Sequence, residues 1–563
     1  MAEAQLVPNR VSQEEQTEVL EKTLEKVGNE GWWVWCVFFM ASTPGLFNAA
    51  HIMSYVFLSH TPTHWCQIDE LVATNWTNQQ IISVSTIGGN SSTSFCSYYD
   101  WNYTYLAQLE YQEALKYTSQ SPKPKLIPCK KYDYDETVPK SSIVSEWDLV
   151  CENAALRSNA QVSIAIGKFV GGFIFGFIAD KFGRKRSFVL SCLLYIVSGP
   201  AAGFTQSFLV FTIARFFIGI AGSGVYESAY TILTEIAVKK RRTIFGCTFN
   251  MSYPVGYITL AIIAFYFQSW RSLQYAISIP TLFLLIHCWF IPESPRWLLA
   301  QGRRADAWQV IQGVEKSLIP DDFFHNSKIG VEGSNKSKSW FKRLMLSMGK
   351  LLSIFNNKEL CSRIIICYIT WFGAALSYYA IALNADNFTA NRYMYVALNG
   401  LTEAPSYILP LLLLTFLGRK SAASLLFLVC GSALISILSL SPEDKDVIVI
   451  VAMLGRFCIS AVFAVIILHT SELFPTSNRN TAIGTSLTMS QLGSIGAPYI
   501  VDVLGAYGWY IPSTICGCLS LLSGLLILLL PETKDKPLFD NIEDLKETHH
   551  NDRVSIKNCC FFS

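Results

Sequence analysis

The sequence predicts an all-α polytopic membrane protein with twelve transmembrane helices, arranged as two pseudo-symmetric bundles of six with a large extracellular loop after the first helix. The chain has 563 residues, of which 51% are hydrophobic and 15% charged, whereas soluble domains carry about 25% charged residues. Runs of about twenty mainly apolar residues recur between short charged turns. Sequence features of the first half also return in the same order in the second half.

The apolar runs give the expected helices and domains. The expected spans are residues 32–58, 158–179, 188–204, 209–236, 245–267, 272–291, 361–383, 392–417, 421–440, 447–471, 481–504 and 509–530. The expected domains are a cytoplasmic N-terminus (1–31), an N-terminal bundle (32–291) that includes an extracellular loop (59–157), a cytoplasmic linker (292–360), a C-terminal bundle (361–530) and a cytoplasmic tail (531–563). The net charge of +2 gives no global field that would indicate a nucleic-acid partner.

The segment between the first two spans has the features of an extracellular loop. Its cysteines and Asn-X-Ser/Thr acceptors together are typical of a disulfide-linked, glycosylated loop. The cysteines are Cys66, Cys96, Cys129 and Cys151, and the acceptors are Asn75, Asn90 and Asn102. Four cysteines allow three pairings, and the sequence leaves all three open. The alternative is a cytosolic insert with chance acceptor sites.

An extracellular loop fixes the sidedness of the other segments. Counting spans from this loop places the Lys/Arg-rich segments 181–186, 239–242, 296–358 and 419–420 on one face, together with both termini. An excess of Lys and Arg marks the cytoplasmic face of a membrane protein. We therefore expect a multi-pass protein of the plasma membrane with both termini in the cytoplasm.

One pattern of charged residues occurs once in each half. An Arg within a span is followed by a Glu near the end of that helix, and a second Arg follows the Glu by seven residues. The first-half residues are Arg215, Glu235 and Arg242, and the second-half residues are Arg456, Glu472 and Arg479. Six-helix halves in parallel order are a transporter architecture with the substrate site between them near mid-membrane. The alternative is that Arg and Glu only mark helix ends.

Six features occur in a fixed order around the spans. They are Thr61–Cys66, the Cys-bearing loop, Ala179–Lys185, Pro292–Leu298, Glu472–Thr476 and Leu530–Thr533. In this order they resemble the major facilitator superfamily, and within it the organic cation, anion and zwitterion transporter family, which is solute carrier 22-like. The resemblance implies the major facilitator fold and transport by alternating access. One departure is Thr415, where the family usually carries an Asp, which would weaken the second-half part of the cytoplasmic latch.

Carboxylates and guanidinium groups near the cytoplasmic helix ends suit a gate. Such groups can pair when the inner ends of the two halves meet and separate when they part. The expected gate residues are Asp180, Arg184, Glu235, Arg242, Glu293, Arg296, Glu472, Arg479 and Glu532.

Charged residues within spans are costly and usually face a cavity. Glu227, Glu403 and Lys168 are the main candidates, and the resemblance places Glu403 in the cavity of the family. Aromatic residues add possible cation–π contacts, although packing is the alternative for each. The expected substrate-binding residues are Glu403, Glu227, Gln491, Tyr378, Trp371, Tyr226, Tyr230, Asn48 and Lys168. Gln491 occupies the position at which the family often selects charge, and Lys168 with Glu227 could instead form a self-neutralising pair.

These features predict a secondary transporter, facilitative or ion-coupled, for small organic cations or zwitterions such as quaternary ammonium compounds, carnitine-like compounds and amines. The sequence has no phosphate-binding loop that would indicate ATP hydrolysis. We expect no enzymatic activity, no cofactor and no metal site, and leave H⁺ or Na⁺ coupling open. The alternatives are an organic anion transporter of the same family and, with less support, a membrane receptor or channel.

Overall fold

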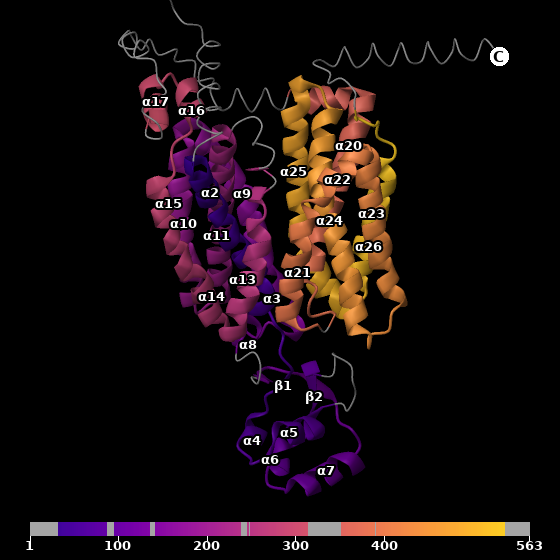
Figure 1. Ribbon diagram of the computed structural model, residues 1–563. Helices are drawn as coiled ribbons and strands as arrows, with labels where there is room; N and C mark the ends of the chain where they lie inside the picture. Colours follow the sequence, from indigo (N-terminus) through magenta and orange to yellow (C-terminus); the bar gives the residue numbers. More distant parts are fainter. Residues whose placement is uncertain are drawn as a thin grey trace, which may run out of the picture.

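The computed structural model describes residues 32–86, 95–135, 141–237, 245–312 except 247, and 349–534 except 350 and 389. Two helical bundles lie side by side, and a small domain projects from one end (Figure 1). We call the end that carries this small domain the loop end. The opposite end, which carries α16 (Pro295–Ala300) and α17 (Arg304–Gln312), is the linker end.

The order of the helices along the chain follows the two bundles. The first bundle contains α2 (Trp32–Met53) with α3 (Tyr55–Leu58), α9 (Asn159–Phe182), α10 (Arg184–Phe204), α11 (Phe208–Ile236), α13 (Ser252–Tyr266), and α14 (Trp270–Ser278), η3 (Ile279–Phe283) and α15 (Leu284–Phe290) in series. The second contains α20 (Lys358–Leu383), α21 (Arg392–Ser406) with α22 (Leu409–Phe416), α23 (Arg419–Ser436) with η5 (Ile437–Ser439), α24 (Lys445–Leu473), α25 (Thr476–Tyr499) with η6 (Ile500–Leu504) and η7 (Gly505–Tyr507), and α26 (Ile511–Ile527).

Nine helical segments in the described part of the chain are long and apolar enough to cross a membrane. They coincide with nine of the twelve expected spans. The remaining three expected spans correspond to the shorter apolar helices α13 and α26 and to α25, which is rich in Ser and Thr. Spanning by these three helices, and hence the number twelve, stays a prediction.

Two of the expected spans are interrupted near prolines. A 3-10 segment, η3, separates α14 from α15 and has Pro280 in its first turn. The eighth span breaks between α21 and α22, near Pro405 and Pro410. Proline lacks the backbone N–H of a continuous helix and crowds the preceding turn, which explains the breaks. Hydropathy does not register this effect, and it therefore predicted both helices as unbroken.

The small domain contains two short antiparallel strand pairs. β1 (His64–Cys66) pairs with β4 (Tyr132–Tyr134), and β2 (Ser97–Tyr99) pairs with β3 (Leu126–Pro128). Its helices are α4 (Asp69–Val72), α5 (Asn78–Ser85), α6 (Tyr103–Leu106) and α7 (Tyr111–Gln120), and α8 (Ile143–Glu146) and η2 (Cys151–Ser158) lead back to the bundle. The disulfides are Cys66–Cys129 and Cys96–Cys151, one of the three pairings that the sequence allowed.

Two of the expected glycosylation sites are exposed in this domain. Asn75 lies on the surface after α4, and Asn102 caps α6 by accepting a hydrogen bond from the backbone N–H of Tyr105. Asn90 lies outside the described residues. Glycosylation at all three positions stays a prediction.

Glycines bring α9 and α11 into close contact. A Cβ atom added to Gly167 would lie 2.2 Å from the carbonyl oxygen of Phe216, and one added to Gly171 would lie 2.5 Å from that of Ile220. Only glycine allows this backbone approach. The contact fixes the register of α9 on α11, and therefore the positions of the charged side chains that these helices carry.

The two bundles meet along a limited set of helices. α9 packs against α25, and α13 packs against α21. At the second contact, a Cβ atom added to Gly400 would lie 2.7 Å from the carbonyl oxygen of Pro254, so α21 and α13 approach closely. These contacts set how the first bundle packs against the second, and a small cavity between them is lined by residues that include Lys168, Tyr379 and Ser494.

Candidate functional site

Two charged side chains of the first bundle, Lys168 on α9 and Glu227 on α11, lie near one another. Gly172 lies one turn after Lys168 on α9, and a Cβ atom added to Gly172 would lie 3.2 Å from Oε1 of Glu227. Residues one turn apart on a helix are about 5–6 Å apart. Glu227 accepts a hydrogen bond of 2.8 Å from Ser223, and Lys168 donates one of 3.3 Å to Tyr379 across the interface between the bundles. The described residues show no ion pair between Lys168 and Glu227 at these positions.

Glu403 has a different environment. Its side chain is 1% exposed and forms a 2.7 Å ion pair with Arg456, whose side chain is fully buried. The hydroxyls of Tyr378 and Tyr407 also donate to Glu403. The Arg456 guanidinium lies 3.5 Å from the centroid of the Tyr378 ring. Glu403 is therefore neutralised within the second bundle, whereas Glu227 has no such partner in the described structure.

Aromatic side chains connect the two bundles at this level. Tyr226 contacts Tyr253 with ring centroids 5.4 Å apart, and the hydroxyls of Tyr257 and Tyr378 lie 3.3 Å apart between the bundles. Tyr230 is 40% exposed. Tyr226 and Tyr230 also pack on Phe249, with ring centroids 4.9 and 5.2 Å apart. Aromatic rings near a carboxylate are groups that can contact a cation.

The remaining predicted binding residues are less accessible. Trp371 is 1% exposed and donates to Thr470, and Asn48 is 4% exposed and donates to Tyr253. Gln491 is partly buried on α25, one turn before Ser494, which lines a small cavity together with Lys168. Roles for these residues in binding stay predictions.

At the linker end, each bundle holds a matching group of charged residues. In the first bundle Arg184 pairs with Glu235 at 3.1 Å and with Asp180 at 3.4 Å, and Glu293 accepts from the backbone N–H of Arg184 at 2.8 Å. The ion pairs therefore join residues of one bundle.

The second bundle repeats this arrangement. Arg419 pairs with Glu472 at 3.2 Å, and Glu532 accepts from the backbone N–H of Arg419 at 2.8 Å. Burial raises the pKa of Glu532, but hydrogen bonds from the backbone N–H groups of Lys534, Thr533 and Arg419 outweigh burial, so its pKa lies below its usual value.

The remaining predicted gate residues are Arg242, Arg296 and Arg479. Nε and one terminal nitrogen of Arg479 are buried without a hydrogen-bond partner in the described structure. Arg296 lies in the first turn of α16, and Arg242 lies outside the described residues. A gate that joins the bundles at the linker end stays a prediction for another conformation.

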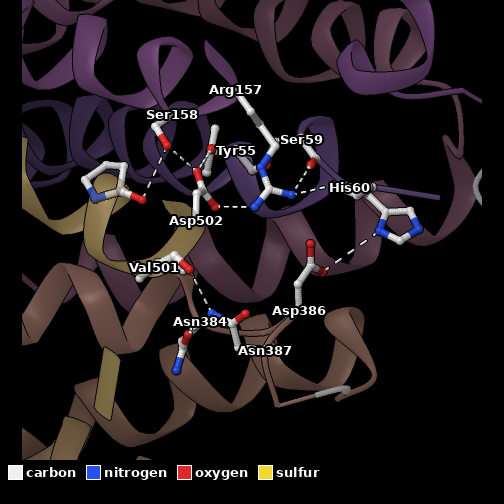
Figure 2. Close-up of polar contacts among 12 residues, drawn as sticks. Tyr55, Ser59, His60, Arg157, Ser158, Asn384, Asp386, Asn387, Val501 and Asp502 are labelled. Atoms are coloured by element: carbon white, nitrogen blue, oxygen red, sulfur yellow. Dashed lines mark hydrogen bonds and ion pairs between the residues drawn. The ribbon is translucent and has the colours of Figure 1, made fainter. Parts of the chain in front are cut away.

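At the loop end, polar contacts do join the bundles (Figure 2). Asp502 of η6 pairs with Arg157 of η2 at 2.5 Å and accepts hydrogen bonds from Ser158 and Tyr55. Nearby, the ring of Phe57 stacks on that of Tyr393 with centroids 5.5 Å apart. The loop end is therefore closed in this structure, and Glu227 is solvent-exposed on the linker-end half of α11.

Known proteins with similar sequences match nearly the whole chain. The family described as sugar (and other) transporter matches residues 90–544. The organic cation transporter protein of Drosophila melanogaster is 31% identical and aligns with 90% of this chain and 91% of its own length. Solute carrier family 22 member 4 of Mus musculus is 31% identical, with coverage of 91% and 92%. The chain belongs to solute carrier family 22, within the major facilitator superfamily.

Two further proteins complete the comparison. The organic cation/carnitine transporter 2 of Homo sapiens is 28% identical to this solute carrier 22 protein and covers 90% of both chains. The xylose transporter XylE from E. coli, in a partially occluded inward open conformation, matches with a TM-score of 0.57 at 15% identity, covering 90% of this chain and 100% of XylE. The sequence comparisons establish a membrane transporter rather than an enzyme, and the XylE structure confirms the major facilitator fold.

Sequence reasoning missed several polar residues of this solute carrier 22 protein. Arg456 was assigned only to the repeated pattern, although an Arg inside a predicted span calls for a counter-charge such as Glu403. Asp502 lies inside the predicted eleventh span and could have been found by the same rule. His60 and Asp386 lie just beyond predicted spans, where no sequence signal distinguishes a residue that joins the bundles from an exposed one.

Proposed function

We propose that this protein transports small organic cations or zwitterions across the plasma membrane by alternating access, with the loop end extracellular and both termini cytoplasmic. The glycosylation sites and the distribution of Lys and Arg support this sidedness. In the described structure the loop end is closed and Glu227 is open to solvent, as expected of a state that faces the cytoplasm.

The observation that carries the proposal is the difference between the two carboxylates. Glu403 is enclosed and paired with Arg456, whereas Glu227 is exposed and its carboxylate accepts a hydrogen bond only from Ser223 among the contacts described. A carboxylate in a chamber at membrane depth is expensive unless a cation neutralises it. Glu227 therefore supplies the negative charge that a substrate ammonium group would meet, beside the rings of Tyr226 and Tyr230.

Lys168 extends the proposal from cations to zwitterions. Its ammonium group lies about one helical turn from Glu227, and it contacts the hydroxyl and the ring of Tyr379. Arg215 of α11 is fully enclosed and donates to Ala160, Gln161 and Ser54, and Lys181 lies in the last turn of α9 at the linker end. Glu227 and Lys168 carry opposite charges, and a substrate with one ammonium and one carboxylate group would satisfy both.

Uptake kinetics with matched substrates test this assignment. Oocytes expressing the protein would be given a radiolabelled quaternary ammonium compound, a carnitine-like zwitterion and a para-aminohippurate-like anion. We expect Glu227→Gln to raise KM about tenfold or more for the cation and the zwitterion, because the variant loses a charge contact with the ammonium group. A loss of about 1.4 kcal/mol in binding free energy weakens binding tenfold. We expect Lys168→Gln to raise KM for the zwitterion alone.

Glu443→Gln, at an exposed position between α23 and α24, is the charge-matched control and should leave all kinetics unchanged. Trans-stimulation by internal substrate would support a carrier rather than a channel. Saturable uptake of the anion alone, lost in Lys168→Gln and kept in Glu227→Gln, would replace this proposal with organic anion transport.

A further inference from the structure

Beside the Arg157–Asp502 pair, the loop end contains a second cluster that joins the bundles, consisting of His60, Asp386 and Arg392. His60 follows α3 of the first bundle, whereas Asp386 follows α20 and Arg392 begins α21 of the second. Arg392 Nε lies 2.9 Å from Asp386 Oδ1, and its NH2 lies 2.9 Å from His60 Nε2. The His60 side chain is 13% exposed, and its Nδ1 lies 3.9 Å from Asp386 Oδ1 (Figure 2).

This geometry determines the protonation state of His60 when the loop end is closed. A guanidinium group has only N–H donors and no acceptor, so His60 Nε2 must accept the hydrogen bond from Arg392. An accepting Nε2 carries no proton, so the ring is neutral. The single ring proton lies on Nδ1, on the side of Asp386.

Protonation of His60 would disrupt this arrangement. A proton on Nε2 would meet an N–H of Arg392 at a separation of 2.9 Å between the nitrogens, so a hydrogen bond would become a repulsive contact. The imidazolium would also add positive charge near Arg392 and Arg157. The facing carboxylate, Asp386, already pairs with Arg392, and Asp502 is engaged by Arg157.

We propose that His60 is an extracellular proton-binding site that controls the loop-end gate, with neutral His60 part of the closed gate and protonated His60 favouring the state open to the outside. The site lies apart from the substrate chamber, and it rests on the extracellular sidedness of the loop end but not on the identity of the substrate. Its ligand is the solvent proton.

The direction of the pH effect follows from the environment of His60. Burial lowers the pKa of His60; Asp386 raises it, and Arg392 and Arg157 lower it, so the pKa in the closed state lies below the ordinary value of about 6.5. The contribution of His60 to closure is therefore complete above pH 6.5 and is lost as pH falls below it. Although burial raises the pKa of Asp386, His60 and Arg392 hold it well below its usual range, so Asp386 stays ionised.

Closure of the loop end over bound substrate is a step of uptake, so external acid should slow influx. At pH 5.5, one unit below the ordinary pKa, the ratio of outward-open to closed protein should rise by up to about tenfold. Influx at saturating substrate should fall accordingly, whereas the return of the empty carrier to the outward-open state should not be slowed.

The direct test measures the opening of the loop end without any substrate. Ser494→Cys places a thiol beside Lys168 in the small cavity between the bundles, and a membrane-impermeant methanethiosulfonate is applied from outside at pH 7.5 and 5.5. The parent without this cysteine gives the background. The change of pH alters ionisation of the thiol equally in each variant. The ratio of the labelling rates at pH 5.5 and pH 7.5 can therefore be compared between variants.

We expect acid to increase relative labelling severalfold with His60 present and to have no such effect in His60→Gln. Gln is neutral at both pH values and keeps an acceptor for Arg392 and a donor for Asp386. His64→Gln is the matched control, because His64 contacts Tyr132 and Tyr134 of the small domain, and it should behave like the parent. His60→Lys, which is charged at both pH values, should label rapidly even at pH 7.5. Equal pH responses in His60→Gln and the parent, or slow labelling of His60→Lys at pH 7.5, would overturn the proposal and leave the transport assignment untouched.

Discussion

Replacing Glu403 by Gln removes one charge of a buried pair and leaves the other in place. Arg456 NH2 lies 2.7 Å from Glu403 Oε2, and the two side chains are 0% and 1% exposed. Arg456 also donates to the carbonyl oxygen of Tyr378 at 2.7 Å. Gln can still accept hydrogen bonds from Tyr378 and Tyr407, so the main loss is the counter-charge of a guanidinium that water cannot reach.

The size of the effect follows from the burial of this pair. Removing one partner of a buried ion pair typically costs about 3–5 kcal/mol, because the remaining charge is uncompensated, whereas replacing both partners with apolar residues is often neutral or stabilising. We therefore expect Glu403→Gln and Arg456→Met each to lose about 3 kcal/mol or more of unfolding free energy. The double variant Glu403→Met with Arg456→Met should lose much less than the sum.

Unfolding of the purified protein in detergent measures these free energies in a double-mutant cycle, with surface expression followed in parallel. The exposed Glu443→Gln control should stay within about 0.5 kcal/mol of the parent. Should Glu403→Gln unfold with the free energy of the parent, or should the two single losses add in the double variant, the pair would not be the buried, coupled unit described here.

Three further predictions concern selectivity and conformational change. Gln491→Asp and Gln491→Arg should shift charge preference in opposite directions, measured as the ratio of cation to anion uptake; the absence of any shift would mean that position 491 does not face the substrate. Gly400→Val should slow influx severalfold with little effect on expression, because its side chain would be forced against Pro254 where the bundles meet; normal influx would show that this contact does not limit closure. Gly183→Ala should lower the unfolding free energy by about 1–2 kcal/mol, since Gly183 has φ +111° and an added Cβ would lie 2.2 Å from Glu293 Oε2; a parent-like denaturation curve would contradict the strained position.

The matching groups at the linker end show how far the sequence repeat extends. The sequence paired Glu235 with Glu472 through equal spacing, and the structure places these residues against Arg184 and Arg419. The sequence expected charge pairs to form between the halves, whereas the described pairs lie within each half. The equal spacing of charged residues in the two halves predicts the repeat. It does not predict which conformation the two halves adopt relative to each other.

The sequence by itself determined the membrane class, nine of the spans, the family and the cysteines available for disulfides. These features depend on local hydropathy and on motifs that are contiguous in the chain. Only the tertiary structure decided that Glu403 is neutralised by Arg456 while Glu227 remains open, and that His60 meets Arg392 at the loop end. Arg456 and Glu403 are 53 residues apart in the sequence, and Arg392 and His60 are 332 residues apart. Contacts between such distant residues set the charge that a substrate or proton meets, and a local sequence pattern cannot predict them.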